Sequence, residues 1–65
     1  MRIAVVGTGM VGRTIAPALA ALGHDVVVGT RDPGTTAARD DWTLDLPLRP
    51  YSDVAEGADL VVNAT

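Results

Sequence analysis

The fold of this chain is decided by the stretch Val5-Val6-Gly7-Thr8-Gly9-Met10-Val11-Gly12. It contains the pattern Gly-x-Gly-x-x-Gly. A short run rich in β-branched residues, at positions 2–6, precedes the glycines, and a pattern with helical periodicity follows them. The sequence therefore predicts a strand, a tight glycine turn and a helix in immediate succession.

Each glycine of this pattern has its own physical role in a dinucleotide-binding turn. Gly7 allows the tight turn, Gly9 lets the backbone approach a pyrophosphate, and Gly12 lets the helix pack closely on its strand. The helix that begins near Met10 directs its free N–H groups and the positive end of its dipole at the anion. The alternative is a glycine-rich turn that binds nothing, and the strand and helix on either side favour the dinucleotide site.

The first helix is expected to lie on the sheet through one apolar stripe. The predicted stripe consists of Val11, Ile15, Ala18, Leu19 and Leu22. Pro17 lies inside this pattern and predicts a kink in a single helix, since the periodicity continues on both sides of it. Gly23 is placed to end the helix.

Length and composition exclude several classes of protein. A chain of 65 residues forms at most one small domain, and this one has no cysteine, so we expect neither disulfides nor a metal site. A net charge of −3 with five scattered arginines argues against binding of nucleic acid. The glycines and Arg13 interrupt the apolar run at the N-terminus, which argues against a signal peptide or a membrane span. We expect a soluble, cytoplasmic protein.

The end of the second predicted strand indicates which dinucleotide is bound. The apolar run 26–28 is followed by Gly29-Thr30-Arg31, where proteins that bind NAD place an acidic residue for the ribose 2′-hydroxyl. Thr30 can donate a hydrogen bond to a 2′-phosphate, and the Arg31 guanidinium can pair with that phosphate. The sequence therefore favours NADP(H), the alternative being a solvated loop.

Asp32 keeps NAD possible as the cofactor, because its carboxylate could turn toward the ribose of NAD. We prefer a capping role, since Asp32 is followed by Pro33, the residue that suits the first position of a helix. The helix that follows is expected to be short.

The remaining chain predicts two further strands. Residues 44–48 suggest a short edge strand, Ser52 is placed to cap one helical turn that ends at Gly57, and residues 59–65 suggest a fourth strand. Trp42 is expected to pack against the sheet. Right-handed crossovers then predict an α/β, Rossmann-like parallel sheet with strand order 3-2-1-4, and Thr65 near the dinucleotide.

Three segments, 7–12, 23–33 and 58–62, together resemble the NADPH-dependent reductases of the deazaflavin coenzyme F420. The resemblance covers nearly the whole chain. It implies that the pyrophosphate is held by the turn formed by Gly7, Thr8, Gly9, Met10, Val11 and Gly12. It also implies that Thr30 and Arg31 hold the 2′-phosphate, and that a deazaflavin coenzyme is the second substrate.

We therefore expect residues 1–65 to be the N-terminal half of an NADP-binding Rossmann domain, from a homo-oligomeric oxidoreductase that transfers hydride between NADP(H) and a second substrate. No residue stands out as a catalytic acid or base, and the cofactor carries the hydride in such chemistry. Two alternatives remain open: a non-catalytic NADP(H) sensor, and an NAD-dependent domain that uses Asp32. In a half-domain the fourth strand would be an unprotected edge, so we expect the isolated chain to self-associate there or to be a portion of a longer chain.

Overall fold

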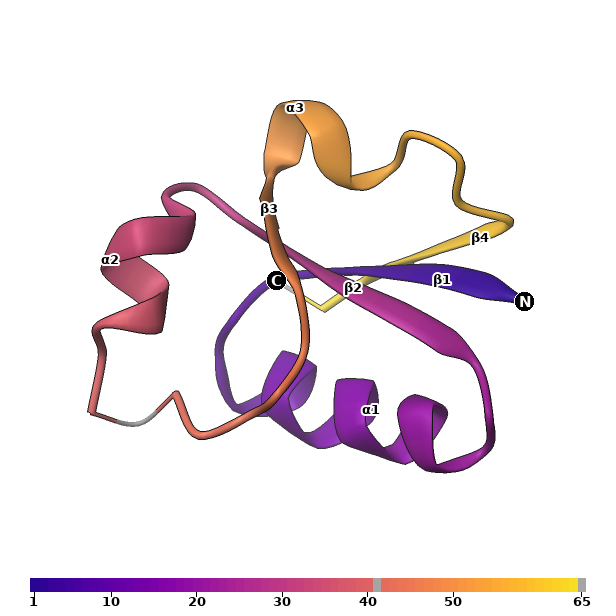
Figure 1. The fold of residues 1–65 in the computed structure, drawn as a ribbon, viewed down its shortest axis with the longest axis horizontal. Helices are drawn as coiled ribbons and strands as arrows, with labels where there is room; N and C mark the ends of the chain where they lie inside the picture. The colour runs from indigo at the N-terminus through magenta and orange to yellow at the C-terminus, as the bar shows by residue number, and fades with distance from the viewer. Residues whose placement is uncertain (41, 65) are drawn as a thin grey trace.

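The computed structural model describes residues 1–40 and 42–64. Its centre is a parallel sheet of four strands in the order β3-β2-β1-β4 (Figure 1). The strands are β1 (Arg2–Val6), β2 (Asp25–Thr30), β3 (Leu48–Pro50) and β4 (Leu60–Asn63). The predicted α/β fold and strand order are therefore confirmed.

The register aligns the carboxyl ends of the two central strands with the first glycine. Val6 of β1 lies opposite Gly29 of β2 and opposite Asn63 of β4. The Gly7 N–H continues the ladder by donating to the Gly29 carbonyl at 3.0 Å. The glycine turn thus leaves the sheet beside the end of β2.

One face of the sheet is covered by α1 (Met10–Ala21), a single helix that contains Pro17 as predicted. The predicted apolar stripe is partly confirmed, because Ile15 and Leu19 pack on the core. It is wrong at Val11, Ala18 and Leu22, which are exposed. The buried positions are Gly12 and Ala16, so the contact face is rotated from the predicted one. The reason is steric, since only the face that carries glycine can approach the backbone of the preceding turn.

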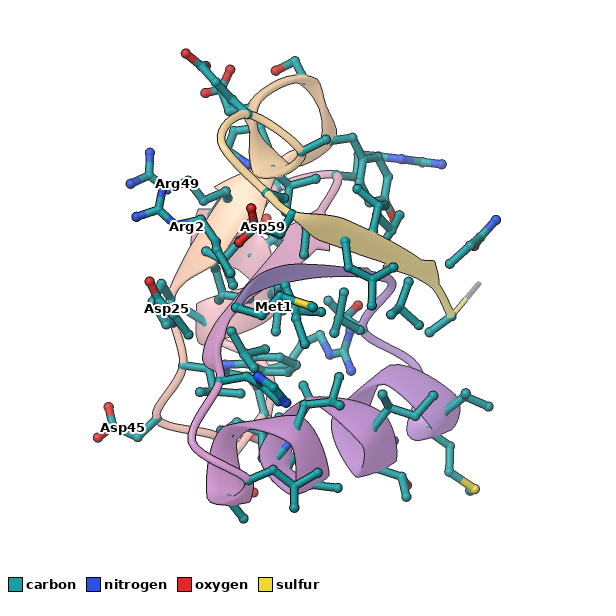
Figure 2. All side chains as sticks on the ribbon, turned by 90° about the vertical axis from the view of Figure 1, so that its right-hand side faces the viewer. Met1, Arg2, Asp25, Asp45, Arg49 and Asp59 are labelled. Carbon is teal, nitrogen blue, oxygen red and sulfur yellow. The ribbon has the colours of Figure 1, made fainter. Side chains whose placement is uncertain are left out.

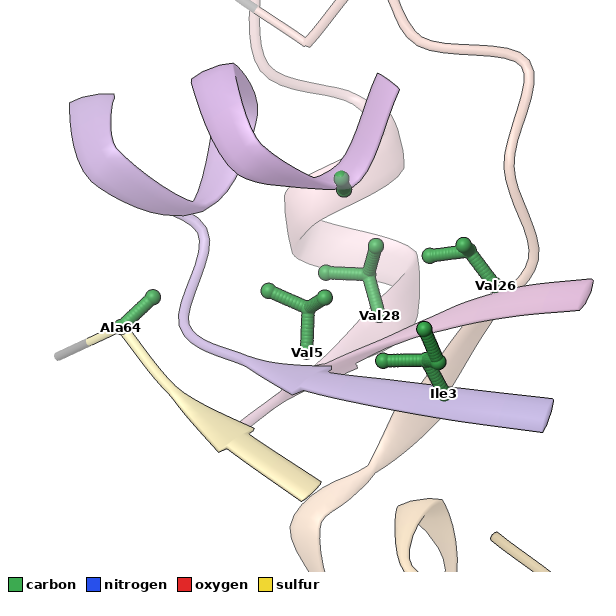
Figure 3. Close-up of a cluster of buried hydrophobic side chains, with 6 residues drawn as sticks. Ile3, Val5, Val26, Val28 and Ala64 are labelled. Atoms are coloured by element: carbon green, nitrogen blue, oxygen red, sulfur yellow. The ribbon is translucent and has the colours of Figure 1, made fainter. Parts of the chain in front are cut away.

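The hydrophobic core lies between α1 and the sheet (Figure 3). It consists of Ile3, Val5, Ala16, Val26, Val28 and Ala64, with partly buried apolar side chains packed around it. Alternate residues of β1 and β2 point into it, as the two-residue period of a strand requires. Trp42 is among the partly buried residues on this cluster, as predicted.

The third strand is not where the sequence predicted it. Residues 44–48 were expected, but β3 begins at Leu48, which pairs with Val28. The preceding apolar residue, Leu46, packs on the core from the connecting loop instead. Hydrogen bonding to β2 begins only where the Pro47 carbonyl accepts from the Val28 N–H at 2.9 Å, so the earlier apolar position reflects burial on the core.

The helical turn after β3 also differs from the prediction. Helix α3 (Tyr51–Val54) begins one residue before Ser52, and Pro50 occupies the N-cap position. The Ser52 hydroxyl makes no capping bond; it is 3.4 Å from a carboxylate oxygen of Asp53. Gly57 adopts a positive φ of 75° in the turn that leads to β4.

Charged side chains gather where the strands begin (Figure 2). The Arg2 backbone N–H donates to the Asp59 carboxylate at 2.9 Å, and the Arg2 guanidinium is 3.5 Å from Asp25. A hollow of about 490 Å³ lies beside Arg2 and Asp25. Its charged lining residues have either sign and include Arg49 and Glu56. No residue of the glycine turn lines this hollow, so it is not the predicted dinucleotide site.

Candidate dinucleotide site

The candidate site lies at the carboxyl ends of β1 and β2, opposite the charged end of the sheet. Two segments leave the sheet there side by side: the glycine turn after β1, and the segment that joins β2 to α2 (Pro33–Ala37) (Figure 1). Parallel α/β sheets bind ligands at the carboxyl ends of their strands, where the strand order reverses. In this sheet the reversal falls between β1 and β4.

The glycines occupy positions that a side chain would disturb in different ways. Gly7 has a φ of 125°, a backbone conformation that L-residues with a side chain rarely adopt. A Cβ atom on Gly12 would contact the carbonyl oxygen of Gly7 and lie 3.0 Å from its carbonyl carbon. Gly9 is exposed, and no other protein atom would lie within 4 Å of its added Cβ.

The space beside Gly9 is therefore open. The packing role predicted for Gly12 is visible directly in its contact with Gly7, and the positive φ of Gly7 provides the tight turn. The open surface at Gly9 fits the close approach of a pyrophosphate.

The first turn of α1 is suited to an anion. Gly9 is the N-cap residue, and no acidic residue lies in the first turn. The residues that follow, Met10 and Val11, are exposed. The N-terminus of a twelve-residue helix with no carboxylate nearby stabilises a bound negative charge through its free N–H groups and dipole.

The two residues predicted to recognise a 2′-phosphate lie beside this turn but differ in exposure. Thr30 ends β2 and is buried, and its hydroxyl lies 2.6 Å from the hydroxyl of Thr36. Arg31 is exposed immediately after the strand. The guanidinium is thus accessible from solvent, whereas the Thr30 hydroxyl is engaged inside the protein.

Asp32 caps α2, as predicted. Its carboxylate accepts a hydrogen bond from the Thr35 backbone N–H at 3.2 Å, and Pro33 follows at the start of the helix. This bond lowers the pKa of Asp32 below its ordinary value, with smaller contributions from the Thr35 hydroxyl and the Gly34 N–H. The carboxylate is therefore held at the helix terminus.

Arg39 is a residue of this region that the sequence did not reveal. It follows α2, and its guanidinium donates to the hydroxyl and to the carbonyl oxygen of Thr8, each at 3.0 Å. The contact spans 31 positions of sequence and belongs to no motif, so no local pattern could have predicted it. Thr65, which was predicted to lie near the dinucleotide, is outside the described residues.

The described residues contain neither a metal-binding cluster nor a membrane-spanning helix. Among residues 1–40 and 42–64, no three histidine or acidic side chains come together as a metal site would require. Within the same residues, no helix is long and apolar enough to cross a membrane.

A parallel sheet of order 3-2-1-4 with flanking helices defines a protein of the Rossmann-like α/β class. The sequence profile of one family, described as NADP oxidoreductase coenzyme F420-dependent, matches residues 2–65. The chain belongs to this family.

A solved structure supports the same assignment. The chain is 56% identical, with a TM-score of 0.89, to a crystallised protein from Arthrobacter sp. FB24 that is provisionally described as an F420-dependent NADP reductase. The match covers 100% of this chain and 33% of the Arthrobacter protein, so the chain spans a third of that relative's length. No curated protein gave a significant match.

Proposed function

We propose that this chain binds NADP(H) for an oxidoreductase that transfers hydride between NADP(H) and a second substrate, a deazaflavin coenzyme of the F420 type. Membership of the family and the name of the Arthrobacter protein support both partners of the reaction. The nicotinamide supplies the hydride chemistry, so this part of the protein is needed mainly to bind and orient the cofactor.

The turn and the start of α1 would hold the pyrophosphate. Open space at Gly9 and the exposure of Met10 and Val11 fit this role. The remaining residues of the proposed cradle are Gly7, Thr8 and Gly12. Thr65 stays a proposed contact of the dinucleotide on the basis of the sequence alone.

The observation that carries the choice of NADP(H) is the arrangement of charge after β2. Arg31 is exposed beside the glycine turn, while the Asp32 carboxylate is occupied by the first turn of α2. A carboxylate held in this way is a poor partner for the 2′-hydroxyl of NAD, and a free guanidinium pairs well with a 2′-phosphate. This arrangement favours NADP(H) over the NAD-dependent alternative.

Thr30 is proposed as the second 2′-phosphate ligand. Its hydroxyl forms a hydrogen bond with the Thr36 hydroxyl, in which either group can be the donor. When Thr36 donates, the Thr30 hydroxyl accepts and keeps its own proton for another partner. The Thr30 proton would then be available to a phosphate at the end of β2 after a rotation of its side chain.

The test is a titration of the purified protein with NADPH and with NADH, repeated on the variant Arg31→Ala. A hydrogen bond to a charged group contributes about 1.5–3 kcal/mol, so the variant should bind NADPH roughly tenfold to a hundredfold more weakly. The affinity for NADH should be nearly unchanged. An equal loss of affinity for both cofactors would contradict the assignment of Arg31 to the 2′-phosphate.

A control variant distinguishes direct pairing of an arginine with the 2′-phosphate from the long-range attraction that any positive charge exerts on the cofactor. Arg49 is also exposed but lines the hollow away from the glycine turn. Arg49→Ala should leave both affinities unchanged. If the unaltered protein binds NADH as tightly as NADPH, the choice of NADP(H) is wrong.

A further inference from the structure

The guanidinium of Arg39 holds one residue of the glycine turn at two points. Nη1 donates to the Thr8 hydroxyl and Nη2 donates to the Thr8 carbonyl oxygen, each at 3.0 Å. Arg39 is half-buried and lies beyond the C-terminus of α2, so the contact joins the segment after β2 to the turn after β1. The fork of an arginine fixes the direction of both bonds.

This contact determines the orientation of a peptide group inside the turn. The Thr8 carbonyl and the Gly9 N–H belong to one planar peptide bond, and in a trans peptide they point in opposite directions. No peptide bond of the described chain is cis. With the Thr8 carbonyl directed at Arg39, the Gly9 N–H is directed away from it.

Such a restraint matters because glycine residues flank Thr8 on both sides. Glycine backbone reaches many conformations, whereas binding an anion through backbone N–H groups requires one of them. A binding segment that already has its bound conformation loses less conformational entropy when the ligand binds, and this increases affinity.

We infer that Arg39 is a positioning residue that presets the Thr8–Gly9 peptide for the pyrophosphate of the dinucleotide, an inference that rests on the proposed function. Each terminal nitrogen of Arg39 donates one hydrogen bond to Thr8, so the guanidinium restrains the turn itself. The pyrophosphate is common to NADPH and NADH. Loss of Arg39 must therefore weaken both cofactors to the same extent, unlike loss of Arg31.

The experiment measures the affinities for NADPH and for NADH of the purified protein and three variants. Arg39→Ala should weaken both cofactors about tenfold. Arg39→Lys keeps the charge but cannot form the planar fork, so it should show an equal, intermediate loss for both. Arg49→Ala removes the same charge from the hollow, which no residue of the glycine turn lines, and should change neither affinity.

Circular dichroism of each variant without cofactor separates lost folding from lost binding. If Arg39→Ala does not fold, Arg39→Lys carries the test. A loss confined to NADPH would make Arg39 a direct ligand of the 2′-phosphate and overturn the inference. Unchanged affinities in Arg39→Ala would also overturn the inference, and so would an Arg39→Lys variant that binds both cofactors as tightly as the unaltered protein.

The proposed function fails in a different way. If the unaltered protein binds neither cofactor, the dinucleotide assignment is wrong and the role of Arg39 falls with it. If the unaltered protein binds NADPH and the Arg39 variants bind it equally well, only the inference is overturned.

Discussion

Gly9 and Gly12 belong to one motif, but substituting them should have opposite consequences. Gly9 has an extended backbone, with a φ of −77°, and open space around its missing side chain. Gly9→Val should therefore fold nearly normally and fail to bind either cofactor, since the valine occupies the space of the pyrophosphate. Thermal unfolding and cofactor titration check the two halves of this prediction.

Gly12→Ala is the matched comparison. Its Cβ would meet the backbone of Gly7, so the helix must move away from the turn. Overpacking of this kind costs about 1–3 kcal/mol, so the melting temperature should fall even before cofactor is added. Normal binding by Gly9→Val would contradict the phosphate cradle, and an unchanged melting temperature for Gly12→Ala would contradict the packing role.

These glycines could be predicted from sequence because each has a local signature. The positive φ at Gly7 and the close contact at Gly12 follow from the motif's spacing. Arg39 has no such signature, since its partner Thr8 is 31 positions away. The hydrogen bond between the Thr30 and Thr36 hydroxyls could not be predicted from the sequence either, because it depends on how α2 packs against the end of β2.

Among the elements, α2 depends most on a single side chain. The helix has five residues, and Asp32 satisfies one of its free N–H groups. Asp32→Ala should lower the free energy of unfolding, because alanine cannot accept this hydrogen bond. Asp32→Asn should cost less, because asparagine also caps helices, and neither variant should change the preference for NADPH.

The charge of Asp32 also predicts a dependence on pH. Its pKa is lower in the folded protein than its ordinary value, so the carboxylate contributes stability above the ordinary carboxyl pKa. That contribution is lost as the pH falls below about 4, through the lowered pKa. The unfolding free energies of the parent protein and Asp32→Asn should therefore converge in acid. A constant difference from neutral pH to pH 3 would contradict this account.

Element boundaries were predicted well where the chain has one strong signal and poorly where two signals compete. The start of α2 follows from Asp32 and Pro33 alone. Between Leu44 and Pro50, apolar side chains that pack on the core imitate a strand, and the pairing begins only at Leu48. For α1 the predicted face was right at Ile15 and Leu19 and wrong at its edges, since Gly12 determines which side meets the turn.

At the scale of the whole molecule, β4 is an edge of the sheet with exposed apolar residues. Leu60 and Val61 are each 47% exposed. An apolar edge strand is a template for pairing with another chain, so residues 1–65 on their own should self-associate. Sedimentation checks this, and Val61→Lys should increase the monomer fraction.

Leu22→Lys provides the control. It adds the same charge at an exposed leucine beyond the end of α1, away from the β4 edge, and should leave association unchanged. A cooperatively unfolding monomer at high concentration would contradict the prediction that this edge needs covering.

The central claim is that the turn after β1 and the end of β2 together hold NADP(H). A crystal structure of the protein with NADP⁺ tests it most directly. The account predicts the pyrophosphate against the backbone of residues 9–12, and the 2′-phosphate beside the Arg31 guanidinium. A dinucleotide bound away from this turn, or a 2′-phosphate directed away from Arg31, would contradict it.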